Sequence, residues 1–434
     1  VVPEKEARSF PQMTDTIKER IEKIRRGQAP EGYKKIHGDI VPLTWDQISL
    51  SDCIIPYEEK TSVANQYPVL TSSRKGLMLQ TDYYSNRQVT TEDNVGYNII
   101  PYGYITFRSR SDDGRFKFNQ NTIIDRGIIS YFYPVFTFSD EVSCEFLLQL
   151  LNHTIYKKMF PYAEGTAQQV LSLKKLGRFK YSVPQIHEQQ KIATVLSSQD
   201  KLVELKEKRL AEKQRQKKYL MQQLLTGKKR LSNFHQPWER KKLADVLTER
   251  REKNIRQNLR ICSVAVQKGV VDQIEHLGRS YAAADTSNYA VAHYGDLIYT
   301  KSPTGDFPYG IIKQSFLPEE VAVSPLYGIF VPNSSELGFF LHTYFESSVN
   351  AYNYLLPIIQ KGAKNTINIK NETFLSNSLY LPTDPLEQKA IANIFLTINQ
   401  EIDLLRQDIE QEKQKKKALM QLLLTGIVRV TPCH

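Results

Sequence analysis

The sequence predicts an α+β protein with an internal pseudo-twofold repeat, in which two mixed α/β domains are separated by two long antiparallel coiled-coil helices. Three observations lead to this fold class. One segment occurs twice along the 434 residues, each copy carries apolar residues at helical spacing, and short β-rich runs precede each copy. A chain of this length is expected to form two or three domains with a substantial buried core.

The repeated segment is the strongest of these signals. Residues 220–227 read Leu-Met-Gln-Gln-Leu-Leu-Thr-Gly, and residues 419–426 read Leu-Met-Gln-Leu-Leu-Leu-Thr-Gly. Over positions 188–230, 15 of 43 residues are identical to those found 199 positions later, without a gap. Weaker matches at an offset of 193 precede the two copies, among them Trp45 with Trp238 and Lys75-Gly76 with Lys268-Gly269. The order predicted along the chain is therefore domain, helix, domain, helix.

Both copies of the segment are predicted to be long helices. Residues 189–225 contain no Gly or Pro and are rich in good helix formers. In the second copy, apolar residues three or four positions apart lie on one helix face: Ile391, Ile394, Ile398, Ile402, Leu405 and Ile409. A helix of about 38 residues is about 57 Å long. Because such a stripe needs a partner, we expect the two helices to pair antiparallel and to hold the two domains apart.

The segments outside the helices predict mixed domains with mainly antiparallel sheets. β-rich runs at 97–108, 122–138, 289–300 and 321–331 are punctuated by Gly, Pro, Asn and Asp. Near the start, Ile17, Ile21 and Ile24 form a helical stripe that ends at Gly27; this arm either packs on the long helices or on a partner, or is mobile. The expected organisation is an N-terminal arm with a short helix (1–37), a first domain (38–180), a central helix (181–231), a second domain (232–377) and a C-terminal helix (378–434).

The net charge of +11 favours a polyanionic partner, either nucleic acid or an acidic membrane surface. Basic and aromatic residues are interleaved in both domains, and Arg and Lys side chains neutralise phosphates and read guanine edges. Arg108 and Lys301, which follow corresponding Tyr-Gly turns, are the sharpest candidates. Charged stretches at 204–218 and 407–417 mix both signs and are interpreted as solvated helix faces. The candidate DNA-binding residues are Arg74, Lys75, Arg87, Arg108, Arg110, Arg115 and Lys117 in the first domain, and Lys268, Arg279, Lys301, Lys361 and Lys364 in the second.

No motif in the sequence predicts catalysis or metal binding. There is no Asn-Pro-Pro-Tyr-like tetrad, no G-x-x-x-x-G-K-[ST] phosphate loop and no H-E-x-x-H. Asp112-Asp113 precede Gly114 and are interpreted as a solvated turn rather than a nuclease centre. The four cysteines form no C-x-x-C pair, which fits a reducing cytoplasm. No apolar stretch approaches the ~20 residues that span a bilayer, so we expect a cytoplasmic protein without a membrane partner.

Each long helix begins with Glu-Gln-x-x-Ile-Ala, at residues 188–193 and 387–392, and ends with Leu-Leu-Thr-Gly, at residues 224–227 and 423–426. In this architecture the doubled signature resembles the conserved helices of specificity (S) subunits of type I restriction–modification systems. The resemblance covers nearly the whole chain from about residue 32.

The resemblance implies DNA recognition without catalysis by the chain itself. Each domain, called a target-recognition domain in that family, would read one half of a split target in double-stranded DNA. The paired helices would set the unread gap and bind two methyltransferase (M) subunits, which two restriction (R) subunits can join. The resemblance places no cofactor on this chain, because S-adenosylmethionine and ATP with Mg²⁺ are expected on the partner subunits.

Two other functions stay open at this point. A self-contained nuclease or methyltransferase would bind S-adenosylmethionine or ATP as an isolated chain. A coiled-coil protein-interaction adaptor, without sequence-specific DNA reading, would lack the steep salt dependence that phosphate neutralisation gives to DNA binding.

Overall fold

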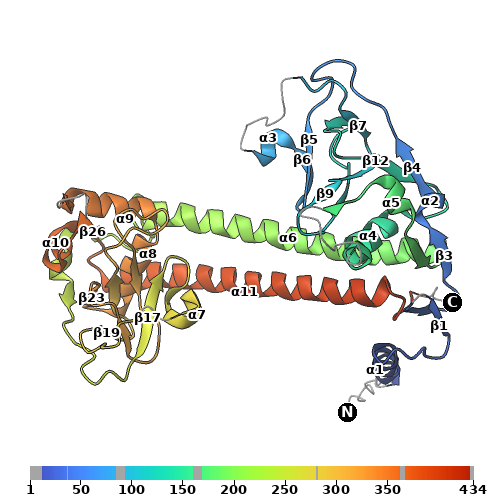
Figure 1. The fold of residues 1–434 in the computed structure, drawn as a ribbon. Helices are drawn as coiled ribbons and strands as arrows, with labels where there is room; N and C mark the ends of the chain where they lie inside the picture. The colour runs from blue at the N-terminus through green and yellow to red at the C-terminus, as the bar shows by residue number, and fades with distance from the viewer. Residues whose placement is uncertain are drawn as a thin grey trace, which may run out of the picture. The chain divides into compact units, whose positions relative to one another are not determined.

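The computed structural model describes residues 12–36, 38–84, 93–159, 169–279, 282–361 and 367–430. The chain divides into two compact units. The first contains Val1–Leu205 with Ile409–His434, and the second contains Lys206–Asp408. Both long helices pass from one unit into the other, so each unit consists of one mixed α/β domain and one end of each helix (Figure 1).

The repeated segments form long helices, as predicted. α6 spans Ile186–Leu224 and α11 spans Pro385–Leu423, and each has 39 residues. Pro385 suits the first position of α11, because an N–H there would have no partner inside the helix. Just beyond the helix ends, Gly227 and Gly426 have φ of +67° and +72°. Glycine adopts this left-handed conformation without the steric cost that a Cβ imposes.

Within each unit the two helices run antiparallel. In the second unit Lys206 Nζ lies 2.8 Å from Asp408 Oδ1, and Lys213 Nζ lies 2.6 Å from Glu401 Oε2. Residue numbers therefore fall along α11 as they rise along α6. The first unit shows the same order in the contacts from Glu188 to Arg429 and from Asp200 to Lys416. Some of the charges predicted to lie on solvated faces thus also pair across the two helices.

The domain of the first unit is built on a four-stranded antiparallel sheet with the order β10-β8-β12-β4. Its buried aromatic residues, Phe107, Phe118 and Phe136, pack against α4 and form the core of this domain. The strands are β1 (Tyr33–Ile36), β2 (Asp39–Pro42), β3 (Asp46–Ser49), β4 (Ile54–Tyr57), β5 (Leu70–Ser73), β6 (Gly76–Leu79), β7 (Asn98–Pro101), β8 (Ile105–Phe107), β9 (Arg110–Ser111), β10 (Phe118–Gln120), β11 (Arg126–Ile129), β12 (Val135–Phe138), β13 (Gln169–Val170) and β14 (Lys180–Val183). The helices are α1 (Gln12–Arg25), α2 (Leu50–Cys53), α3 (Gln80–Tyr83), α4 (Cys144–Met159) and α5 (Leu173–Gly177).

The domain of the second unit contains two four-stranded sheets, ordered β16-β23-β20-β21 and β18-β17-β22-β19. Its strand pairs are antiparallel except for β17 with β22. The strands are β15 (Glu239–Lys242), β16 (Leu247–Glu249), β17 (Arg260–Ala265), β18 (Gly269–Asp272), β19 (Ala290–Ala292), β20 (Leu297–Tyr299), β21 (Ile312–Gln314), β22 (Val321–Val323), β23 (Gly328–Pro332), β24 (Gln360–Lys361), β25 (Ile367–Asn368) and β26 (Ser378–Leu381). The helices are α7 (Gln273–Leu277), α8 (Ser335–Phe345), α9 (Ser348–Leu355) and α10 (Asn371–Ser376).

The two domains share one topology. The sheet β10-β8-β12-β4 corresponds to β21-β20-β23-β16, and the hairpin β5–β6 followed by α3 corresponds to β17–β18 followed by α7. β3 pairs with β14 directly before α6, as β15 pairs with β26 directly before α11. The weak sequence matches at an offset of 193 therefore mark equivalent positions, because Lys75-Gly76 and Lys268-Gly269 lie at the turns of equivalent hairpins.

The ends of the long helices complete the core of each domain. In the first unit, Ile192 and Leu196 of α6 lie in the same buried cluster as Leu423 at the end of α11. In the second unit the roles are exchanged, since Leu224 of α6 is buried together with Ile391 and Phe395 of α11. Each domain is thus packed onto the start of the helix that follows it and the end of the other helix.

A buried glutamate and an arginine clamp the two helices together in each unit. Glu188 of α6 accepts two hydrogen bonds from Arg429, at 2.7 Å from Nε and 2.6 Å from Nη2. Glu387 of α11 accepts the same pair from Arg230, at 2.6 and 2.7 Å, and a third bond from Trp238 Nε1. Bidentate Arg–carboxylate pairs are strong and directional. Each clamp ties the start of one helix to the chain just after the other.

The N-terminal arm packs on the end of the C-terminal helix, which is one of the alternatives that the sequence left open. Its predicted stripe lies on α1, and Gly27 after α1 is left-handed with φ of +74°. Arg20 Nη1 donates to the carbonyl of Ile427, and the Tyr33 hydroxyl donates to the carbonyl of Gly426, both at 2.8 Å. The arm therefore binds the backbone of the turn that follows the C-terminal end of α11.

Candidate nucleic-acid interface

Six of the seven basic residues predicted in the first domain line one hollow of about 640 Å³. Arg74 and Lys75 come from the turn of the hairpin β5–β6, and Arg108 directly follows the central strand β8. The other three, Arg110, Arg115 and Lys117, lie on β9 and on the loop that leads to β10. Residues spread over 44 positions of sequence are thus brought together, and their number in one concave surface points to a polyanionic ligand.

Buried polar contacts fix the hairpin that carries Arg74 and Lys75. Asn119 on β10 donates from Nδ2 to Ser72 Oγ and to the Ser73 carbonyl, both at 2.8 Å. Asn119 is itself buried. The hairpin is therefore anchored to the edge of the four-stranded sheet, and its two cations start from a rigid backbone.

Aromatic side chains hold two of the arginines. The guanidinium of Arg110 lies 4.9 Å from the ring centroid of Phe132, and that of Arg115 lies 5.5 Å from the ring of Tyr156. Such stacking leaves the edge of a guanidinium available to hydrogen-bond acceptors. Sequence reasoning missed Phe132 and Tyr156. Phe132 lies in the β-rich run 122–138 and Tyr156 in the apolar sequence of α4, so the pattern around each predicts a strand or a helix and not a contact with an arginine.

Three tyrosines, Tyr83, Tyr84 and Tyr133, also line the hollow. Burial raises the pKa of Tyr133, although the nearby Arg108 acts in the opposite direction. Its hydroxyl therefore stays protonated at neutral pH and can donate a hydrogen bond. Lys117 is an exposed residue overall, but burial around its ammonium and the charge of Lys416 lower its pKa. A phosphate beside Lys117 would restore the favourable environment of that charge.

In the second domain the structure describes three of the five predicted side chains. Lys268 lies at the turn of β17–β18, in the place that Lys75 occupies in the first domain. Lys301 follows β20 as Arg108 follows β8, is half-buried and has a left-handed φ of +60°. Burial lowers the pKa of Lys301, and Glu249 opposes this effect. Arg279 is exposed just after α7.

The remaining predicted residues are not part of this geometry. Arg87 and Lys364 lie outside the described residues, and only the backbone of Lys361 is described, as part of β24. Their assignment to DNA binding stays a prediction.

Comparison with known proteins gives one consistent result. Residues 42–215 match the family model of the type I restriction modification DNA specificity domain. The chain is 22% identical over 431 residues to the type I restriction enzyme MjaVIII specificity subunit of Methanocaldococcus jannaschii. This match covers 92% of this chain and 96% of that protein. The crystal structure of the type I restriction-modification S subunit from M. genitalium has a similar fold, with a TM-score of 0.53 and 11% identity over 87% of this chain and 96% of that one. The matched domain lies within the first repeat, and the MjaVIII relative spans both repeats.

This chain carries a type I restriction modification DNA specificity domain.

In a specificity subunit the chain supplies DNA recognition and not catalysis, and its partners are DNA and the other subunits of the type I system. The matched residues 42–215 cover the first domain and most of α6, which is one of the two repeats. The domain of the second repeat has the same topology as the matched one. Among the described residues, no helix is long and apolar enough to cross a membrane.

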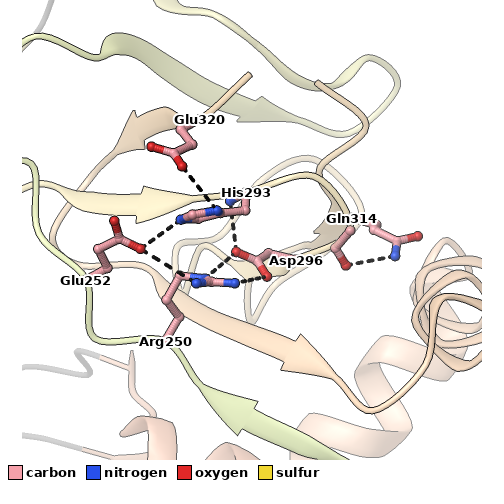
Figure 2. A network of polar contacts seen from close by, with 7 residues as sticks. Arg250, Glu252, His293, Asp296, Gln314 and Glu320 are labelled. Atoms are coloured by element: carbon pink, nitrogen blue, oxygen red, sulfur yellow. Dashed lines mark hydrogen bonds and ion pairs between the residues drawn. The ribbon is translucent and has the colours of Figure 1, made fainter. Parts of the chain in front are cut away.

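The second domain of the specificity subunit also contains a charged network (Figure 2). Arg250 pairs with the buried Asp296 at 2.7 and 3.1 Å. Next to it, His293 Nε2 lies 2.7 Å from Glu252, and its Nδ1 lies 3.5 Å from Glu320. Glu252, His293 and Glu320 bring potential metal-ligand atoms within 4.8 Å of one another. Each imidazole nitrogen already faces a carboxylate, however, so we interpret the group as a polar tie between the turn before β20 and the start of β22.

Proposed function

We propose that the two recognition domains of this subunit read the two halves of one bipartite target in double-stranded DNA. The single observation that carries this proposal is the repetition of one plan in both units. Each unit has a lysine-tipped hairpin, a cation directly after or near the end of the central strand, and a clamp on the long helices. Equivalent scaffolds with different loop residues are expected of two readers with different half-sites.

The proposal also gives the long helices two roles. They pass covalently from one recognition domain to the other, so their length sets the unread gap between the half-sites. They also offer equivalent surfaces to two copies of one partner, the methyltransferase subunit. Leu205 and Leu404, which are 199 positions apart and identical, leave 54% and 64% of their surface exposed. Exposed apolar side chains at matching places of a repeat are expected where two identical subunits dock.

The remaining chemistry is assigned to the partners. S-adenosylmethionine would be bound by the methyltransferase subunits, and ATP with Mg²⁺ by two restriction subunits where these join the complex. The complex would work in the cytoplasm, where the DNA is. The chain would bind no cofactor itself, which is tested by titrating the isolated subunit with S-adenosylmethionine and with ATP.

The experiment that tests the proposal is methylation mapping by single-molecule sequencing. DNA is taken from cells that express a partner methyltransferase subunit with and without this chain. Adenine methylation at one split motif, present only with the chain, is the expected result and gives both half-sites and the gap. Methylation that does not depend on the chain would overturn the proposal.

A coiled-coil adaptor function makes a different prediction for direct binding. A reader binds its target duplex with a steep salt dependence, because it displaces counterions from phosphates, and binds unrelated duplexes more weakly. Equal and weak binding of all duplexes by the subunit complex would favour the adaptor.

A further inference from the structure

The hollow of the first recognition domain contains an acidic turn that DNA binding alone does not explain. Asp112 and Asp113 line it together with the six basic residues. A carboxylate among cations lowers the attraction of the hollow for phosphate groups, since like charges repel at short range. Asp113 therefore needs a role that offsets this cost.

Asp113 is held in a defined orientation by its own loop. Its Oδ1 accepts hydrogen bonds from the Ser111 hydroxyl at 3.0 Å and from the Arg115 backbone N–H at 3.2 Å. The next residue, Gly114, has a left-handed φ of +69° and lies so close to Gln169 that an added Cβ would meet its amide at 2.6 Å. The hydrogen bonds and the close contact of Gly114 with Gln169 therefore restrict the movement of the Asp113 side chain.

The second oxygen of Asp113 binds Arg74. Arg74 Nη2 donates to Oδ2, and these bonds hold the pKa of the Asp113 carboxyl at about 2, so the carboxylate is charged at neutral pH. The backbone of Arg74 is fixed independently by the contacts of Asn119 to the hairpin. Both ends of the Arg74 side chain are therefore anchored before any ligand arrives.

Stability does not account for this pair. The side chains of Arg74 and Asp113 keep 65% and 44% of their surface exposed. Exposed ion pairs contribute little to folding, because water and salt screen them. Within the described residues, Arg74 uses one of its five N–H groups in this pair, which leaves donors for the two acceptors that guanine presents in the major groove.

We propose that Asp113 is a positioning residue for DNA recognition: it presents the guanidinium of Arg74 to one base edge of the first half-site and disfavours binding of Arg74 to phosphates. This inference rests on the proposed function, and it names the residue pair that determines specificity at one base pair. Pre-organised arginines lose less conformational entropy when they bind a base than mobile ones do.

The test uses the subunit in complex with its methyltransferase subunits and compares Asp113→Asn with the wild-type chain. Asparagine keeps an oxygen acceptor for Ser111 and Arg115 but removes the charge that orients Arg74. Dissociation constants are measured by fluorescence anisotropy for the mapped target, for duplexes with one base pair changed at a time, and for an unrelated duplex. Asp140→Asn, an exposed charge change outside the hollow of the same domain, is the matched control.

Asp113→Asn is expected to reduce discrimination at one base pair of one half-site by about tenfold, and to bind the unrelated duplex several-fold more tightly. Arg74→Ala should lose discrimination at the same base pair, and the double variant should lose no more than Arg74→Ala alone. A purely structural role would instead weaken binding to every duplex equally. Equal weakening for every duplex would overturn the inference, as would unchanged discrimination in Asp113→Asn. Discrimination retained in Arg74→Ala would also overturn it. A wild-type complex without any sequence preference would overturn the proposed function itself.

Discussion

At the scale of single residues, Arg108 and Lys301 are the clearest pair for separating the two readers. Each lies just after the central strand of its domain, β8 or β20. Arg108→Ala should weaken recognition of one half-site only, and Lys301→Ala that of the other half. The expected loss is roughly 1–3 kcal/mol for a base contact. Dissociation constants for duplexes altered in one half at a time check this, and an equal effect of either change on both halves would contradict the two-reader proposal.

His342 predicts a pH dependence of stability in the second unit. Burial lowers the pKa of His342 to about 4, and its Nδ1 accepts a hydrogen bond from the Gln314 N–H, which needs the unprotonated ring. In the unfolded chain the imidazole titrates near 6.5. Between these values the unfolded state binds more protons, so stability is complete above about pH 6.5 and falls as the pH drops towards 4.

The expected loss is about 3 kcal/mol over that range. Urea unfolding between pH 7.5 and 4.5 measures it, with His342→Gln as the comparison. Glutamine keeps an acceptor near the Gln314 N–H but does not titrate, so its stability should fall less steeply with pH. Identical slopes for the two proteins would show that His342 does not cause the effect.

Residue by residue, the sequence singled out the cations that line the hollow but not the groups that orient them. Arg74 and Arg108 stood out because basic and aromatic residues are interleaved in the loops of a chain with a net charge of +11. Asp113 was interpreted as a solvated turn, and nothing local distinguishes it, because its role depends on an arginine 39 positions away. The contact between Arg110 and the ring of Phe132 likewise depends on the tertiary fold, so the local sequence does not reveal it.

At the scale of elements, the repeated signature predicted the long helices because the same residues make the contacts that join helices to domains. Glu188 and Glu387 of the signature accept hydrogen bonds from Arg429 and Arg230, and each arginine lies just after the other long helix. The strands were predicted more coarsely. The run 122–138 contains β11 and β12, which belong to different sheets, and periodicity within a short run cannot reveal a change of sheet.

Gly426 joins the end of α11 to the first domain and predicts a large effect of a small substitution. An added Cβ would lie 2.6 Å from Pro42 and 3.0 Å from Trp45, and φ is +72°. Gly426→Ala should lower the free energy of unfolding of the first unit by about 3 kcal/mol, from backbone strain and overpacking together. Urea unfolding measures the change.

The matched control is Gly27→Ala, at the end of α1. Gly27 has a nearly equal φ of +74°, but nothing lies within 4 Å of its added Cβ. Gly27→Ala should lower the free energy of unfolding by about 1 kcal/mol, from backbone strain alone. Equal effects of the two substitutions would show that the contact with Trp45 and Pro42 contributes nothing.

At the scale of the whole molecule, the chain is two units of one plan, of which the first is formed from two separate segments and the second from one continuous segment. The first domain is completed by residues around Leu423, and the second by residues around Leu224. The sequence predicted the repeat and the antiparallel pairing, since identities at one offset and an unpaired apolar stripe imply both. It did not predict that the helix ends enter the domain cores, because that depends on contacts between residues more than 160 positions apart, such as Leu224 with Ile391.

The proposed spacer role predicts what a change of helix length does. Seven residues inserted in both helices at the boundary of the units, after Leu205 in α6 and after Asp408 in α11, lengthen the pair by about 10.5 Å. Since seven residues make almost two turns, the facing residues keep their side of the helix. At about 3.4 Å for each base pair, the gap of the methylated motif should grow by about three base pairs while both half-sites stay the same.

Methylation mapping in cells measures the gap directly. An insertion in α6 alone serves as the control. It makes the two helices unequal in length between the units, so the helix pairing of one unit must lose its register, and methylation should fall without defining a new gap. If the double insertion left the gap unchanged, the helices would not set the spacing. If it changed a half-site, recognition would depend on contacts that reach across the helices, and the two domains would not be independent readers.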